Sequence, residues 1–366
     1  MSARNSIYDL SLTDLSDILR EWGQPDYRAR QIWHGLYKNL WESPHEFSNL
    51  PKLLRQQLEE NFSFSNLKLV KAMTSPKGDA EKYLFELTDK HAIETVLMFY
   101  DENPSLSDRG IIEKSSRRSL CVSSQVGCAL GCVFCATGQM GFHRNLHRGE
   151  IIEQILSVER KLRLLGKRLT HITFMGMGEP FHNYNEVISA IEYLNQPEGM
   201  NFGARRFTIS TVGIVPMIRR FTSEQWQINL AISLHAAEND LRSQLLPINR
   251  KYPLEELMDA CREYVQKTRR KVTFEWALIQ YVNDQVSQAR QLSELLKGIL
   301  CHINLIPLNP SLGYLGHGSS PERVALFQSE LLRLGFSCTV RLRRGIDIQA
   351  GCGQLATQNA QLQRRT

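Results

Sequence analysis

The spacing of hydrophobic positions changes along the chain, and the first stretch has a helical period. In SLTDLSDILREWG, Ser11 stands three residues before Asp14 at the start of an apolar run, which is the spacing of a helix capping box. In PDYRARQIWHGLYKNLW, apolar positions such as Ile32 and Leu36 recur at helical spacing. These patterns predict a small N-terminal helical domain over residues 1–65.

A strand pattern follows the helical one. KYLFEL and HAIETVLMFY are two apolar-rich runs separated by the polar residues TDK, which is the pattern of a β-hairpin. The next stretch, DENPSLSDRGIIEKSSRR, predicts an exposed loop over residues 101–118. Residues 66–118 are therefore expected to form a hairpin extension and a linker.

From residue 119 onward, short apolar runs alternate with helical segments. The runs are LCVSS, HITFMG, RFTIST, INLAISLH, VTFEWALI, HINLIPL and CTVRL, with helical patterns such as GEIIEQILSVERKLRLL between them. Alternation of this kind predicts βαβ units and a parallel sheet. We therefore expect an α/β protein whose largest domain, residues 119–356, is a full or partial (β/α) barrel, with a C-terminal tail over residues 357–366.

Polar residues follow several of these predicted strands, where a parallel barrel places its chemistry. Any one of them alone is more simply explained by turn chemistry. Because the carboxyl ends of parallel strands meet at one end of a barrel, their shared location predicts a single site. The residues are Glu179, Ser210, Ser233, His235 and Asn309.

Composition and charge narrow the class of protein. The 366 residues are 42% hydrophobic and 22% charged, which is enough for a large core. The N-terminal MSARNSIYDLSLTDL lacks the apolar stretch of a signal peptide, and no apolar run reaches the roughly 20 residues of a membrane span. We expect a cytoplasmic protein without membrane contact. The net charge is +6, and the basic clusters ARR, IRR, QKTRRK and RLRRG are either a footprint for RNA phosphates or solvated helix ends.

Four of the eight cysteines stand in CVSSQVGCALGCVFCATGQMGF, and three of these have the spacing C-x3-C-x2-C. Thiols stay reduced in the cytosol, so this group predicts metal binding or chemistry rather than a disulfide framework. Three thiolates cannot close a tetrahedral zinc site, although Cys121 or His143 could supply a fourth ligand. Alternatively, the fourth position is open, so that one iron of a [4Fe–4S] cluster can bind a small molecule. The strand directly before the loop favours the cluster, because it places the loop at the mouth of the barrel.

The C-x3-C-x2-C loop at the start of a partial barrel resembles the cluster loop of radical S-adenosylmethionine (SAM) enzymes. Six segments, CVSSQVGC, MGMGEP, AISLHA, LLPINRKYPLEEL, INLIPLNP and GIDIQAGCGQL, together resemble the RlmN/Cfr family of radical SAM RNA methyltransferases. The resemblance implies a partial barrel of the radical SAM type and a [4Fe–4S] cluster whose open iron chelates SAM. It also implies two SAM molecules per turnover, one giving a methyl group and the other a 5′-deoxyadenosyl radical.

The resemblance assigns roles to individual residues. Cys352 is similar to the family's methyl-carrying cysteine, Cys121 to the cysteine that resolves the protein–RNA adduct by forming a disulfide, and Glu94 to the general base. Gln349 and Gly351 stand where Asp and Ala are usual, but they remove none of these residues. The matching cluster ligands are Cys128, Cys132 and Cys135, and the matching SAM-binding positions are Gly178, Glu179, Ser210, Ser233, His235 and Asn309.

The implied function is methylation of C2 of an adenosine in the peptidyl-transferase centre of 23S rRNA and of an anticodon-loop adenosine in tRNA. Cfr-type methylation of C8 of the same rRNA adenosine uses the same catalytic positions and stays open. A non-catalytic, zinc-dependent RNA-binding protein is the alternative of another class, but it leaves GMGEP and Cys352 unexplained. The expected electron donor is a low-potential protein such as flavodoxin or ferredoxin, and we expect a monomer.

Overall fold

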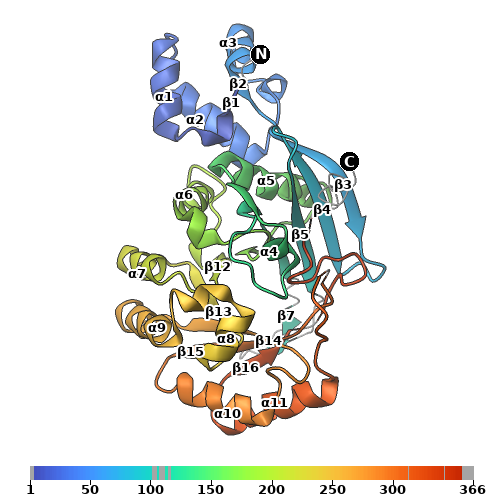
Figure 1. The fold of residues 1–366 in the computed structure, drawn as a ribbon. Coiled ribbons are helices and arrows are strands. Elements are labelled where there is room, and N and C mark those ends of the chain that lie inside the picture. Colours follow the sequence, from blue (N-terminus) through green and yellow to red (C-terminus); the bar gives the residue numbers. More distant parts are fainter. Residues whose placement is uncertain are drawn as a thin grey trace.

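The computed structural model describes residues 4–100, 105–106, 112–113, 117–311, 313–341 and 343–356. Figure 1 shows a helical module at the N-terminus, a barrel built of alternating strands and helices, and an antiparallel extension along one side of the barrel. Within the predicted loop, β6 (Ser105–Leu106) pairs with β7 (Ile112–Glu113). The predicted C-terminal tail lies outside the described residues.

The described strands include one ten-stranded sheet in the order β16-β15-β14-β13-β12-β11-β8-β5-β4-β3. The strands from β8 to β16 run parallel to one another, and each of the predicted apolar runs contributes one of them. This confirms the predicted partial (β/α) barrel. The parallel strands are β8 (Arg117–Cys121), β11 (His171–Phe174), β12 (Phe207–Thr211), β13 (Asn229–Ser233), β14 (Val272–Leu278), β15 (Cys301–Pro307) and β16 (Cys338–Val340).

Helices connect the parallel strands and cover the outer face of the sheet (Figure 1). Their buried residues recur every three or four positions, as Leu257, Cys261 and Tyr264 do in α9, so one apolar stripe packs on the strands. The covering helices are α5 (Arg148–Leu164), α6 (Tyr184–Asn195), α7 (Val215–Glu224), α9 (Leu254–Thr268), α10 (Val286–Leu295) and α11 (Pro321–Arg333). The short helix α8 (Asn239–Leu245) instead packs beside Cys128 and Cys132. Between β8 and α5 the chain forms β9 (Gln125–Gly127), α4 (Ala136–Gln139) and β10 (Phe142–Asn145).

The hairpin extension continues the barrel sheet. As predicted, β4 (Ala80–Leu87) and β5 (Ala92–Tyr100) are antiparallel, and β5 also pairs with β8. A third strand, β3 (Leu67–Thr74), pairs with β4 at the edge of the sheet. The sequence analysis missed β3, because most of its side chains are exposed and no buried face marks it as a strand.

The N-terminal module consists of α1 (Leu12–Glu21), α2 (Tyr27–His34), a following π-helical turn (Gly35–Asn39) and α3 (Lys52–Asn61), with β1 (Asn5–Ser6) paired to β2 (Phe62–Ser63). The predicted capping box is present: Asp14 N donates to Ser11 Oγ at 2.9 Å, and Ser11 N donates to Asp14 Oδ2 at 2.8 Å. The module packs on α5, where Arg160 Nε donates to Leu40 O at 2.7 Å. Among the described residues, no helix is long and apolar enough to cross a membrane.

Candidate active site

A cavity of about 880 Å³, partly open to solvent, lies at the carboxyl ends of the parallel strands. Every residue predicted for SAM binding lines it, although these residues come from the ends of four different strands. Cys132, Cys135 and Cys352 line the same cavity. The predicted SAM residues in its wall are Gly178, Glu179, Ser210, Ser233, His235 and Asn309.

The segment from Cys128 to Cys135, here called the cluster loop, leads from β9 to α4. Cys128 and Cys132 are buried, and Cys135 is the N-cap residue of α4. Burial raises the pKa of Cys128 to about 12, and burial together with the neighbouring cysteines also raises the pKa of Cys132. Three thiolates in such a place need a compensating positive charge, which the irons of a cluster supply.

The possible metal ligands can be compared with what a zinc ion and a [4Fe–4S] cluster each require. Among the residues that the structure describes, no three His, Cys, Asp or Glu side chains are placed to hold one metal ion. In a zinc site all thiolates bind the same ion, whereas in a [4Fe–4S] cluster each thiolate binds a different iron. His143, a candidate fourth zinc ligand, packs against His91 with ring centroids 4.8 Å apart. Three thiols in one short loop are the donor set that a [4Fe–4S] cluster uses.

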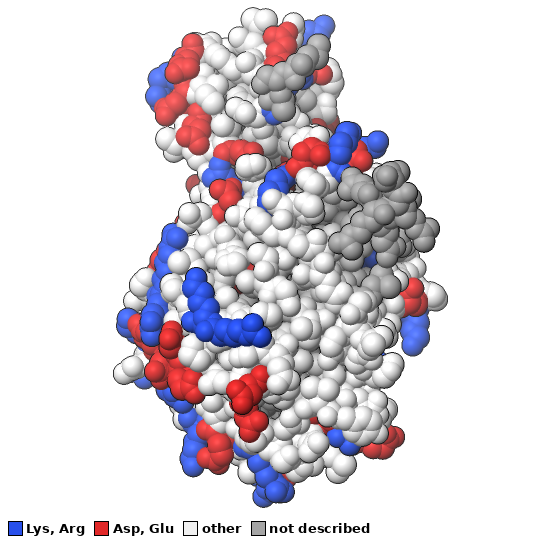
Figure 2. All heavy atoms as spheres, viewed as in Figure 1, with Lys and Arg blue, Asp and Glu red and all other residues white. Residues whose placement is uncertain are grey.

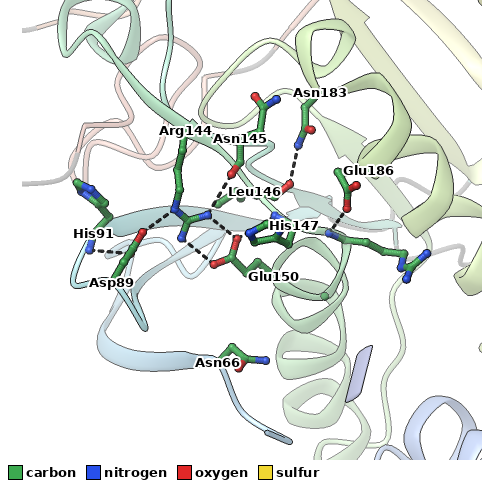
Figure 3. A network of polar contacts seen from close by, with 12 residues as sticks. Asn66, Asp89, His91, Arg144, Asn145, Leu146, His147, Glu150, Asn183 and Glu186 are labelled. Atoms are coloured by element: carbon green, nitrogen blue, oxygen red, sulfur yellow. Dashed lines mark hydrogen bonds and ion pairs between the residues drawn. The ribbon is translucent and has the colours of Figure 1, made fainter. Parts of the chain in front are cut away.

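The chain that returns from the cluster loop is anchored by a polar network (Figure 3). Arg144 Nε lies 2.5 Å from Asp89 Oδ2 in the β4–β5 turn. The same guanidinium donates both Nη atoms to Glu150 at 2.8 Å, and Glu150 Oε2 also accepts from His147 N at 2.9 Å. On the other side of the cluster loop, Gly127 is the last residue of β9. A Cβ there would lie 1.9 Å from a backbone oxygen, so only glycine fits. These contacts fix both sides of the cluster loop.

Gly178 and Glu179 form the part of the cavity wall that follows β11. Gly178 has φ +100°, and a Cβ there would lie 2.5 Å from the side chain of Gln125. The Glu179 carboxylate accepts from Phe181 N and Val212 N, each at 3.0 Å. Burial raises its pKa to about 7 despite these bonds. A bound ammonium group would therefore stabilise the ionised carboxylate and be stabilised by it.

His235 and Asn309 present hydrogen-bonding atoms to the same cavity. His235 Nδ1 accepts from Ala277 N at 2.9 Å, which assigns the proton of the neutral ring to Nε2. Burial, helped by the charge of Arg242, lowers the pKa of His235 to about 3, so the ring is neutral at pH 7. Asn309 Nδ2 donates to Cys352 O at 3.2 Å, whereas Asn309 Oδ1 is buried without a partner. An unpartnered buried acceptor is costly, and a ligand donor would satisfy it.

The loop around Cys352 sits on the cluster loop. Ala136 N donates to Gly353 O at 2.8 Å, and Thr137 Oγ1 donates to Leu355 O at 2.6 Å. These bonds join the C-terminal segment of the barrel to the helix that begins directly after Cys135. The structure thus brings Cys352 beside the cluster loop, more than 200 positions away in sequence.

Cys121, the last residue of β8, meets Cys352 in a second, smaller cavity. Both cysteines line it, together with Arg341 and Arg343. Burial raises the pKa of Cys121 to about 12, and a charge on Cys352 would raise it further, whereas the Arg341 guanidinium acts in the opposite direction. The predicted pair of thiols is therefore assembled at one place.

Glu94, the predicted general base, lies on β5 and is 2% exposed. Its carboxylate is paired with Lys82, with Nζ 3.0 Å from Oε1, and Oε2 accepts from Ala356 N at 3.0 Å. Burial raises the pKa of Glu94, and the Lys82 charge lowers it. Glu94 is thus close to the Cys352 loop, but it is not among the described residues that line either cavity.

Two charged residues of the site were missed by the sequence analysis. Arg341 was assigned to a basic surface cluster, which is wrong, because its side chain lines both cavities beside Cys352. Glu275 lines the larger cavity, and its Oε2 is buried without a partner. A signal for Glu275 was available, because a lone carboxylate inside the apolar run VTFEWAL is unusual for a strand buried on both faces.

The basic clusters do not form one surface. ARR and QKTRRK precede β12 and β14, at the end of the barrel opposite the cavity, and the arginines of IRR pair with Glu224 and Glu263. On the face shown in Figure 2, basic and acidic residues are interspersed around a broad uncharged area. In RLRRG, Arg344 lies 3.7 Å from Asp79, whereas Arg343 is exposed beside the second cavity. Arg343 is therefore the member of these clusters best placed to meet a substrate at the site.

Comparison with known proteins gives consistent matches. Residues 122–292 match the radical SAM superfamily, and residues 5–63 match the ribosomal RNA large subunit methyltransferase N-terminal domain. Two relatives named probable dual-specificity RNA methyltransferase RlmN are similar over nearly the whole chain. The protein from Chloroflexus aurantiacus is 44% identical over 97% of this chain and 93% of its own length. The protein from Staphylococcus carnosus is 42% identical over 99% of this chain and 95% of its own length.

A solved structure agrees with the fold. The crystal structure of a radical SAM methyltransferase from Sphaerobacter thermophilus is 47% identical in sequence, with a TM-score of 0.90. The match covers 96% of this chain and 99% of that chain. These similarities favour an enzyme over the non-catalytic, zinc-dependent RNA-binding protein.

Proposed function

Since the chain belongs to the RlmN/Cfr family of radical SAM RNA methyltransferases, we propose that it methylates C2 of adenosine in two RNAs. The substrates are an adenosine in the peptidyl-transferase centre of 23S rRNA and an anticodon-loop adenosine in tRNA. The observation that carries the proposal is the convergence of the cluster loop, Cys352 and Cys121 at one end of the barrel.

The residues around the larger cavity fit the two cofactors that this family uses. The three cluster-loop thiols would hold a [4Fe–4S] cluster. Glu179 would accept hydrogen bonds from the ammonium group of SAM, and Asn309 Oδ1 would accept from another donor of the same ligand. When bound, the cluster supplies the electron that cleaves SAM, while SAM supplies both a methyl group and a radical that removes hydrogen, so that two SAM molecules serve one turnover.

Cys352 is the residue that receives the methyl group. Its thiolate forms a bond to the methyl carbon as the bond between that carbon and the SAM sulfonium breaks, and the thiol proton goes to solvent. Removal of one hydrogen atom from this methyl group then lets its carbon bond to C2 of the adenine. The bonds from Thr137 to Leu355 O and from Asn309 to Cys352 O support this assignment, because they hold the Cys352 loop beside the thiols that would bind the cluster.

Glu94 and Cys121 complete the reaction. Glu94 takes up the proton from C2 while the radical adduct gives up one electron, which the oxidised cluster would accept, so that the aromatic base is left joined to Cys352 through a methylene group. The Cys121 thiolate then attacks Sγ of Cys352. An S–S bond forms as the S–C bond breaks, and the released base takes up a proton to become methyladenosine. A dithiol reduces the disulfide before the next turnover.

The substrate adenosine has to leave its stack to reach this site, which costs a few kcal/mol that contacts to the RNA backbone must offset. Exposed Arg343 and the N-terminal module are the parts of the chain that we assign to RNA binding. We further propose a low-potential electron donor such as flavodoxin or ferredoxin, a monomeric state and a cytoplasmic location.

Anaerobic methylation of rRNA fragments and of tRNA, followed by mass spectrometry of the nucleosides, tests this function. The proposal expects 2-methyladenosine from wild-type protein and none from the Cys352→Ala variant. Formation of 8-methyladenosine would instead show that the protein catalyses the Cfr-type methylation of C8. Reconstituted protein that cleaves SAM but methylates neither RNA would overturn the proposal.

A further inference from the structure

Two charged side chains meet in the interior beside the Cys352 loop, defined here as residues 349–356. The side chains of Lys82 and Glu94 are each 3% exposed, and Lys82 Nζ lies 3.0 Å from Glu94 Oε1. In the β4–β5 ladder, Lys82 pairs with Val96 and Leu84 pairs with Glu94, so the two charges lie diagonally on one face of the hairpin. Desolvating two such groups is costly, and removing only one of them leaves the other charge buried without its partner.

The ion pair also binds both ends of the Cys352 loop. Lys82 Nζ donates to Gln349 O at 3.2 Å, and Ala356 N donates to Glu94 Oε2 at 3.0 Å. Gln349 has φ +53°, a left-handed conformation that is unfavourable for a residue other than glycine. The backbone at Gln349 is therefore held in an unfavourable conformation at the point where Lys82 binds it.

The middle of the loop is attached on its other side. Asn309 Nδ2 donates to Cys352 O at 3.2 Å, and Ala136 N donates to Gly353 O at 2.8 Å. Cys352 thus lies between two attachments to the hairpin and several attachments to the barrel and to α4. The hairpin attachments differ from the others, because they depend on a single buried ion pair.

We propose that Lys82 is a positioning residue, which together with Glu94 latches the Cys352 loop to the hairpin and presents Cys352 to the cavity. The inference rests on the proposed function in so far as it takes Cys352 as the methyl carrier. The latch and the general base share one carboxylate oxygen, since Glu94 Oε2 is bonded to Ala356 N. Glu94 consequently becomes free to take a proton through this oxygen when the Ala356 end of the loop opens.

The first test uses protein without cofactors. Lys82→Met keeps most of the side-chain volume but removes the charge and the bond to Gln349. Amide hydrogen exchange of residues 349–356 should become about tenfold faster, and alkylation of Cys352 should accelerate with it, while exchange in the barrel strands stays unchanged. Unchanged protection of the loop and unchanged alkylation of Cys352 would overturn the proposal.

Two further variants keep the test decisive. Lys82→Met leaves the Glu94 carboxylate buried without its cation, so the double variant Lys82→Met/Glu94→Gln removes the ion pair as a unit and should fold even where the single variant does not. It should loosen the loop in the same way. Glu81→Gln is the matched control, because it breaks an ion pair of the same strand, between Glu81 and Lys161 of α5, and removes no contact to the Cys352 loop. Equal loosening of residues 349–356 in this control would contradict a specific latch.

A second readout distinguishes positioning from a general loss of structure. After reconstitution, the Lys82→Met protein should retain its cluster absorbance and cleave SAM, but transfer a methyl group to Cys352 at least about tenfold more slowly than wild type. A parallel loss of SAM cleavage and methyl transfer would count against positioning. If the wild-type protein never carries a methyl group on Cys352, the proposed function fails, whereas the exchange experiment still decides whether the latch exists.

Discussion

Replacing Asn309 by leucine should affect SAM binding and the stability of the cofactor-free protein in different ways. The two polar atoms of its side-chain amide differ in their surroundings. Nδ2 donates to Cys352 O at 3.2 Å, whereas Oδ1 is buried without a partner. Leucine has the same branched skeleton as asparagine and is somewhat larger, so the substitution removes both polar atoms without opening a cavity.

The two contributions to the free energy of unfolding have opposite signs. Loss of the bond to Cys352 destabilises the protein by about 0.5–1.5 kcal/mol, whereas removal of the unpartnered buried oxygen restores about 1–3 kcal/mol. Asn309→Leu should therefore unfold with a free energy equal to that of wild type or higher by about 1–2 kcal/mol. SAM loses an acceptor for one of its neutral donors, which is worth about 0.5–1.5 kcal/mol and corresponds to a roughly 2- to 10-fold higher Kd.

Denaturant unfolding of the cofactor-free protein and equilibrium dialysis of SAM against reconstituted protein measure the two effects. Ser311→Ala is the matched control, because it removes one hydrogen bond in the same segment, from Ser311 Oγ to Phe134 O at 2.9 Å, at a residue outside the cavity wall. This control should lose about 1 kcal/mol of stability and keep its SAM affinity. An Asn309→Leu protein that is clearly less stable but binds SAM as tightly as wild type would refute the reasoning.

Further predictions concern the metal, a thiol, the RNA and the backbone. Replacing any one cluster-loop cysteine by alanine should abolish iron and sulfide binding after anaerobic reconstitution, whereas the buried core variant Cys261→Ala should keep both. Because burial raises the pKa of Cys121 to about 12, its alkylation in the cofactor-free protein should accelerate about tenfold per pH unit from about pH 7 to 10, and a plateau near pH 9 would contradict this. Arg343→Glu should weaken RNA binding about tenfold at low salt in a filter-binding assay, and Lys297→Glu, the same charge change at an exposed helix residue, should not. Gly178→Ala should lower stability by about 2 kcal/mol or more in thermal unfolding, because its Cβ would lie 2.5 Å from the side chain of Gln125.

Local pattern was sufficient to predict the barrel and most of the site. Each parallel strand is an apolar run bounded by turn residues. A parallel strand is buried on both faces, so such a run is the pattern expected for it. The residues predicted to bind SAM line one cavity because they follow such strands. The edge strand β3 was missed for the opposite reason, since its exposed side chains carry no burial pattern.

Long-range burial could not be predicted in the same way. Lys82 sits in a strand whose period suggests an ordinary polar position, and its burial depends on Gln349, 267 positions later. Arg341 reads as part of a basic surface cluster, but the strand that it follows turns its side chain toward Cys352 and Glu275. The burial of such residues is determined by contacts between segments far apart in the sequence. The local hydrophobic periodicity carries no information about these contacts.

The central claim is that Cys352 carries the transferred carbon and Cys121 releases it. Denaturing gels of protein expressed in cells test this directly, with Cys121→Ala, Cys352→Ala and the double variant run side by side. The account predicts a nuclease-sensitive, slower-migrating band for Cys121→Ala, because no thiolate is present to attack Sγ of Cys352, and no such band for the other two. A Cys121→Ala protein that carries a methyl group on Cys352 but shows no RNA adduct would contradict it.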